Sequence, residues 1–116
     1  MEELISLDNL KAISRDNHGF IREILEVYLS STPKDLLKLQ THVVEENWEM
    51  VRYFAHKMKS SSFTIGFIEG FKIFQKMENT IKDNEDLTGI HEVMQQASTL
   101  CDNAHVQVKI ELSNYL

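Results

Sequence analysis

The stretch from Phe54 to Gly66, FAHKMKSSSFTIG, carries the residues whose types and spacing could do chemistry. Its histidine, His56, is followed by Lys57 and Lys59, then by three serines and a glycine. Neutral imidazole is a good nitrogen nucleophile near pH 7, and neighbouring ammonium groups can stabilise a transferred anionic group. The question is whether His56 faces a partner or is an ordinary helix residue.

Helical geometry places His56 on the solvent face of a helix. At about 100° per residue, an apolar stripe falls within about 40° of the side opposite His56. The members of that stripe are Val51, Phe54, Met58, Ser61 and Ile65. The residues within about 60° of His56 are Glu49, Arg52, Lys59, Ser60 and Phe63. An exposed aromatic, Phe63, beside basic residues indicates a docking surface that includes Arg52 and Phe63.

The same residues also have structural interpretations. A lone helix histidine is commonly a surface or core residue without a role. Ser61 and Ser62 lie toward the buried side, where they would keep a helix interface thin and bond back to carbonyls four residues earlier. Ser60 lies beside His56, but a Ser–His nucleophile needs an orienting acid and an oxyanion hole. Since a regular helix face offers neither, the pattern argues against a hydrolase.

Helical spacing continues along most of the 116 residues, with only four glycines and one proline. We expect one domain, 1–116, with a short helix at about 8–14 and long helices at about 18–45, 47–65, 68–83 and 87–113. Four long amphipathic helices with short loops predict an all-α, up-and-down four-helix bundle, with the short N-terminal helix covering one end. Pro33 either begins a new segment capped by Thr32 or kinks a continuous helix.

The apolar periodicity also predicts the core. Gly66 is expected to cap the C-terminal end of the His56 helix. The apolar residues that show this spacing on the other helices are Leu7, Leu10, Ile13, Phe20, Ile24, Val27, Tyr28, Leu36, Leu37, Leu39, Val43, Val44, Ile68, Phe71, Phe74, Met77, Ile81, Ile90, Val93, Met94, Ala97, Leu100, Cys101, Ala104 and Val108.

Composition excludes several classes of function. The net charge of −6 argues against nucleic acid and anionic membranes as partners. Cys101 is the only cysteine, which favours a reducing, cytoplasmic setting. The first residues do not read as a signal peptide, and no apolar run reaches the roughly 18 residues of a membrane span. No glycine-rich phosphate loop is present, so we expect no ATP site.

The histidines do not predict a metal site. The five of them, His18, His42, His56, His91 and His105, include no pair at the i, i+3 or i, i+4 spacing of zinc ligands. The four other than His56 are interpreted as surface residues.

Residues 55–66, AHKMKSSSFTIG, resemble the signature of histidine phosphotransfer (HPt) domains, A-H-x-[LM]-K-G-[SA]-[SA]-x-x-[LIV]-G. The matching residues are Ala55, His56, Met58, Lys59, Ser61, Ser62, Ile65 and Gly66. The layout is also similar to the family, so the resemblance covers about residues 5–114. One departure is Ser60, where the family usually has a glycine that lets a partner approach the imidazole. We expect serine to be tolerated, with its effect on transfer rate and partner preference open.

The resemblance implies a phosphate carrier rather than an enzyme. His56 would accept a phosphoryl group from a receiver-domain aspartate and pass it to a second receiver, with Lys59 and Lys57 stabilising the phosphoryl group. No cofactor is implied, because the receiver supplies Mg²⁺ and acidic residues. We expect a monomer whose partners are response-regulator receiver domains, including that of a hybrid sensor histidine kinase. The alternative is a non-catalytic helical interaction module that has lost phosphotransfer.

The family also has a residue on the following helix, 22 positions after the histidine, that often hydrogen-bonds it. Here this position is Glu78, with Gln75 one turn earlier. Glu78 either holds the second ring N–H and fixes the tautomer or is a solvent-facing charge.

Overall fold

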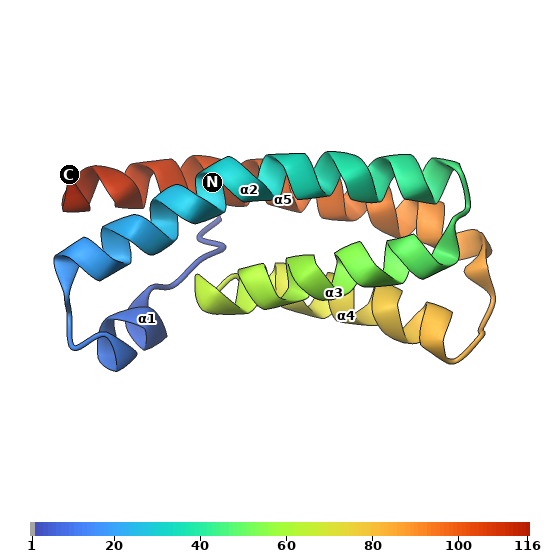
Figure 1. Ribbon diagram of the computed structural model, residues 1–116, viewed down its shortest axis with the longest axis horizontal. Coiled ribbons are helices and arrows are strands. Elements are labelled where there is room, and N and C mark those ends of the chain that lie inside the picture. Colours follow the sequence, from blue (N-terminus) through green and yellow to red (C-terminus); the bar gives the residue numbers. More distant parts are fainter. Residues whose placement is uncertain (1) are drawn as a thin grey trace.

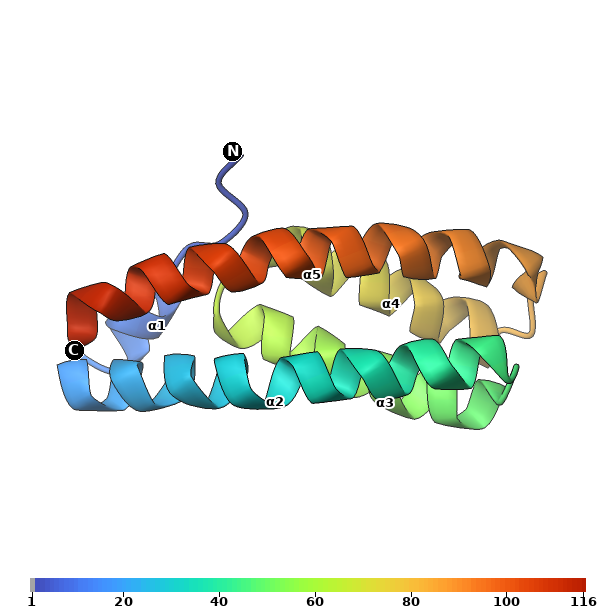
Figure 2. The same cartoon turned by 90° about the horizontal axis from the view of Figure 1, so that it is seen from above.

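The computed structural model describes residues 2–116, and in this range the chain is helical without strands. Its elements are α1 (Asp8–Ile13), α2 (His18–Val44), α3 (Trp48–Thr64), α4 (Ile68–Lys82), α5 (Ile90–Leu112) and the 3₁₀ turns η1 (Leu87–Gly89) and η2 (Ser113–Tyr115). The four long helices run alternately in opposite directions, and α1 lies at the end of the bundle where α2 begins (Figure 1 and Figure 2). This is the predicted all-α, up-and-down four-helix bundle with a short N-terminal helix.

Asparagine side chains begin the first two long helices. Asn17 accepts a hydrogen bond from the Phe20 N–H at 3.1 Å, and Asn47 accepts one from the Met50 N–H at 3.4 Å. Each side chain satisfies one of the backbone N–H groups that a helix start leaves unpaired. These caps fix where α2 and α3 begin.

Helix α2 continues through Pro33 without a break, which decides between the two interpretations of that residue. Proline has no N–H to donate to the carbonyl of Leu29, one turn earlier. Thr32 does not cap a new helix: its hydroxyl donates to the Tyr28 carbonyl at 2.6 Å. Every helix within residues 2–116 is too short or too polar to span a lipid bilayer.

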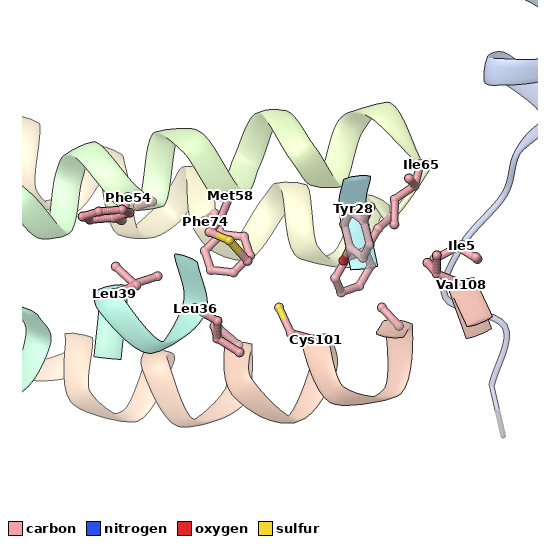
Figure 3. Close-up of a cluster of buried hydrophobic side chains, with 14 of the residues drawn as sticks. Ile5, Tyr28, Leu36, Leu39, Phe54, Met58, Ile65, Phe74, Cys101 and Val108 are labelled. Carbon is pink, nitrogen blue, oxygen red and sulfur yellow. The ribbon is translucent and has the colours of Figure 1, made fainter. Parts of the chain in front are cut away.

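The core lies along the bundle axis, where side chains from all four long helices meet. Figure 3 shows Tyr28, Leu36 and Leu39 of α2 facing Phe54 and Met58 of α3 across the interior. Phe74 of α4 and Cys101 and Val108 of α5 complete the cluster. Burial, with the nearby negative charge of Asp102, raises the pKa of the Cys101 thiol to about 12.

Several residues of the predicted apolar stripes are exposed, chiefly on α2. Phe20 and Val27 are exposed, whereas Ile21, Leu25 and Tyr28 are buried. Each of the two exposed residues stands one position before a buried one, which is a rotation of about 100° around the helix. The predicted stripe of Phe20, Ile24, Val27 and Tyr28 is therefore rotated from the buried one and shares Tyr28 with it.

The other exposed residues of these apolar stripes are Ile13, Leu37, Val44 and Ile68. Ile68 is replaced in the core by the preceding residue, Phe67, which is fully buried. Two histidines predicted at the surface, His42 and His105, are half-buried. The His42 ring stacks on Phe54, with centroids 5.6 Å apart.

Gly66 ends α3 with a left-handed turn, as predicted. Its φ is +67°, its N–H donates to the Phe63 carbonyl at 3.1 Å, and the Phe67 N–H donates to the Ser62 carbonyl at 2.8 Å. This pair of bonds is the Schellman motif, which glycine permits without strain. A Cβ at Gly66 would lie 1.9 Å from the carbonyl oxygen of Ser6, so the N-terminal segment also passes too close for any side chain.

Helices α3 and α4 approach each other closely beyond this turn. A Cβ at Gly70 of α4 would lie 2.8 Å from the Ser62 hydroxyl of α3 and 2.5 Å from the Phe67 ring. The hydroxyls of Ser62 and Ser61 donate to carbonyls four residues earlier, at 2.8 and 3.2 Å, which confirms the predicted back-bonding. Small residues thus set the contact between the two helices.

We predict that Gly66→Ala lowers the free energy of unfolding by roughly 2–4 kcal/mol, because alanine meets both a left-handed backbone and a backbone carbonyl. Urea denaturation measures the change. Gly19→Ala is the matched control, because an added Cβ there lies 3.5 Å from its nearest neighbour, the Asn17 side chain. It should be neutral or stabilise by up to about 1 kcal/mol. Equal effects of the two substitutions would contradict the role given to Gly66.

Candidate functional site

His56 lies on the solvent face of α3, as the helical geometry predicted. Its side chain is 61% exposed, while the opposite face of α3 buries Val51, Phe54, Ala55 and Met58. The imidazole is therefore accessible to a partner and contributes nothing to the core.

Glu78 of α4 joins His56 and Lys59 through one carboxylate. His56 Nδ1 lies 2.8 Å from Glu78 Oε2, and Lys59 Nζ donates to Glu78 Oε1 at 2.6 Å. A carboxylate only accepts hydrogen bonds, so Nδ1 must carry the ring proton. In the neutral imidazole, the lone pair then lies on Nε2, which is the nitrogen free to react.

The Glu78 carboxylate is largely covered, with 12% of its side chain exposed, and does not lie free in solvent. Burial raises the pKa of Glu78, but the hydrogen bonds from Lys59 and His56 and their charges outweigh burial and lower that pKa below its ordinary value. The carboxylate is thus negatively charged at neutral pH. Gln75, one turn earlier on α4, is half-buried, and the contact with His56 is made by Glu78.

Lys57 is directed toward α2. Its ammonium group donates to Oδ1 of Asp35 at 3.1 Å, and the Asp35 side chain is only 5% exposed. The other oxygen, Asp35 Oδ2, is buried without a hydrogen-bond partner in the described chain. Lys57 is therefore the cation that compensates a buried carboxylate.

Asp35 was not predicted from the sequence as part of the site. The available signal was an acidic residue within the apolar stripe of α2, between Thr32 and Leu36, both of which are buried. Charged residues are rarely fully buried unless they are paired, so a partner could have been sought.

A shallow depression surrounds His56. Its walls are formed by Glu49, Arg52, Tyr53, Lys57, Ser60 and Glu78. Arg52 and Ser60 were predicted beside the histidine, whereas Tyr53, which is 58% exposed, was missed. The signal for Tyr53 was an aromatic residue three positions before His56, on the same helix face.

Phe63 extends this surface toward the end of α3. It is 57% exposed, and its ring centroid lies 5.9 Å from that of Phe71 on α4. It is thus not turned into the core. Among residues 2–116, no group of three or more histidine, cysteine or acidic side chains is placed to hold a metal ion.

Comparison with known proteins gives consistent results. A sequence model of the Hpt domain family matches residues 23–113. The fold is similar to that of the HPT domain from a Shewanella sensor hybrid histidine kinase, with a TM-score of 0.84, over 96% of this chain and 95% of that chain. The two sequences are 18% identical, so this likeness concerns the fold. No curated protein matches the chain in sequence.

The lowered pKa of Glu78 leads to a prediction about stability. A carboxyl whose pKa is lower in the folded chain stabilises the fold at pH values above its ordinary pKa, here 4.5. This contribution is lost as the pH falls through the folded-state pKa. We expect Glu78→Gln to lower the free energy of unfolding by about 1 kcal/mol at pH 7, with the difference disappearing in acid. Denaturant titrations from pH 7 to pH 3 would measure it, and a constant difference would contradict this origin.

Proposed function

The chain belongs to the Hpt domain family, and we propose that it accepts a phosphoryl group on His56 from one receiver domain and passes it to another. Hpt domains are phosphotransfer modules of two-component signalling, phosphocarriers rather than classical enzymes, and they interact with response-regulator receiver domains. The observation that carries the proposal is the exposed His56, with its Nδ1 proton held by Glu78 and its Nε2 free.

The reaction requires only a nucleophile from this chain. Nε2 attacks the phosphorus of an aspartyl phosphate on the receiver, the phosphorus–oxygen bond breaks, and the electron pair stays on the receiver carboxylate. The ring becomes positively charged, because Nδ1 keeps its proton. Transfer to a second receiver reverses these steps, and each receiver supplies Mg²⁺ and its acidic residues.

The surroundings of His56 suit such a partner. Lys59 lies one turn away on the same helix and can place positive charge on a phosphoryl group. Arg52, Tyr53 and Phe63 offer charge and apolar area for docking, while the small Ser60 leaves room beside the imidazole. We propose a monomeric domain that meets its receivers, including one of hybrid-kinase type, in a reducing, cytoplasmic setting.

We predict that His56→Gln abolishes phosphate uptake and leaves the melting temperature within about 2 °C, since an exposed side chain contributes little to stability. The measurement is incubation with a phosphorylated receiver, followed by detection of acid-labile, alkali-stable phosphate, the behaviour of phosphohistidine. Normal labelling of the variant would contradict the assignment of His56. A wild-type chain that binds receivers but takes up no phosphate would instead be an interaction module that has lost transfer.

We predict that Phe63→Ala weakens receiver binding by roughly 1–3 kcal/mol, because truncating an interface aromatic removes buried apolar area. Titration calorimetry with an unphosphorylated receiver would measure it. Ile110→Ala is the control: Ile110 is 61% exposed on α5, the helix diagonal to α3 in the bundle. If Phe63→Ala bound normally but lost stability, Phe63 would be structural.

A further inference from the structure

His56 lies between two lysine–carboxylate pairs that neighbouring helices complete. On one side, Asp35 of α2 holds Lys57, and on the other, Glu78 of α4 holds Lys59. Both lysines are close to the histidine in sequence, so either could be assigned to the phosphoryl group. The two pairs differ in whether the carboxylate keeps a hydrogen-bond partner after its lysine moves away.

The Asp35 pair is fixed. Asp35 is almost completely buried, its Oδ2 has no partner among the described residues, and its Oδ1 is bonded to Lys57. Moving Lys57 to a phosphoryl group would leave a buried carboxylate without a counter-charge. Lys57 itself is 49% exposed, but the carboxylate that it compensates is not. Leaving a buried charge without its partner is unfavourable, so Lys57 stays with Asp35.

The Glu78 pair can exchange. Its two carboxylate oxygens have separate partners, Oε1 bonded to Lys59 and Oε2 to the His56 ring. If Lys59 leaves, Glu78 therefore keeps the hydrogen bond from Nδ1. Phosphorylation at Nε2 makes the ring positive, and that remaining bond becomes charge-assisted, which strengthens it.

We propose that Lys59 is the exchangeable cation of the site and that Glu78 competes with the phosphoryl group for it. This inference rests on the proposed function. When Nε2 forms its bond to phosphorus and the bond to the receiver aspartate breaks, Lys59 Nζ moves from Glu78 Oε1 to a phosphoryl oxygen. No proton is transferred, because Nδ1 keeps its hydrogen and Lys59 stays protonated. Glu78 is thus a positioning residue that sets how strongly Lys59 can favour phosphohistidine.

A double-mutant cycle tests this competition. With Glu78 present, Lys59 loses one partner as it gains another, so Lys59→Met should lower the equilibrium constant for transfer from the receiver only about threefold. In the Glu78→Gln background, Lys59 has no competing carboxylate, and the same substitution should lower the constant at least about tenfold. The measurement is the ratio of phosphohistidine to aspartyl phosphate at equilibrium.

Two other results would overturn the proposal. Equal effects of Lys59→Met in both backgrounds would show that Lys59 does not move between the two groups. An effect that vanishes in the Glu78→Gln background would show that Lys59 acts only by holding Glu78. Lys76→Met is the matched control on α4, because it removes an exposed lysine outside the site. It should have the same effect in both backgrounds, as should the combined variant Asp35→Asn, Lys57→Met.

A receiver-free experiment separates this inference from the proposed function. His56 can be phosphorylated chemically with phosphoramidate, and NMR can follow the Lys59 Nζ and Glu78 carboxyl signals. Changes that report loss of the Lys59–Glu78 bond, with the Nδ1 proton still bonded to Glu78, support the exchange. Retention of both bonds overturns it, even if receivers phosphorylate His56. Failure of every receiver to phosphorylate His56 would overturn the proposed function and not the exchange.

Discussion

The contact between His56 and Glu78 depends on the close packing of α3 against α4 at the turn that joins them. His56 stands eleven residues before Phe67 and Glu78 eleven residues after it, so an antiparallel hairpin centred on that turn brings the two side chains opposite each other. Gly66 makes the turn possible, and Ser62 and Gly70 let the helices approach. A shift of one residue would rotate Glu78 by about 100° and remove it from the ring. The free nitrogen of His56 is therefore selected by small residues that lie about 9–15 Å away along the two helices.

The same geometry governs the other side of the site. Asp35 and Lys57 each stand eleven residues from Glu46, which lies in the turn between α2 and α3 with a φ of +55°. Two hairpins thus deliver one carboxylate each to the helix that carries His56. Each lysine beside the histidine is paired with a carboxylate. The surroundings of His56 therefore do not carry the positive charge of two unpaired lysines. This arrangement suits the phosphoryl transfer proposed for His56, in which a neutral imidazole is the nucleophile.

Much of this could be predicted from the sequence because it is local. Periodicity and end signals predicted the helices, the exposure of His56 and the cap at Gly66, all of which depend on neighbouring residues. The core stripe of α2 could not be chosen, because Phe20 and Val27 form an apolar stripe beside that of Ile21 and Leu25. The direction of Lys57 and the environment of Glu78 depend on which helix lies opposite and in which register. Both depend on tertiary packing, which cannot be predicted from the side-chain pattern of a single helix.

The buried thiol of Cys101 gives the molecule an internal reporter. A thiol with a pKa of about 12, enclosed by the bundle, hardly reacts with alkylating reagents while the four helices stay together. Alkylation of Cys101 therefore requires a transient opening of the bundle in which α5 separates from its neighbouring helices. When reclosing is faster than labelling, the observed rate is the intrinsic thiol rate multiplied by the equilibrium constant for opening. A partner that docks and holds the bundle closed should therefore slow the alkylation of Cys101. The rate of this reaction measures docking without any introduced label.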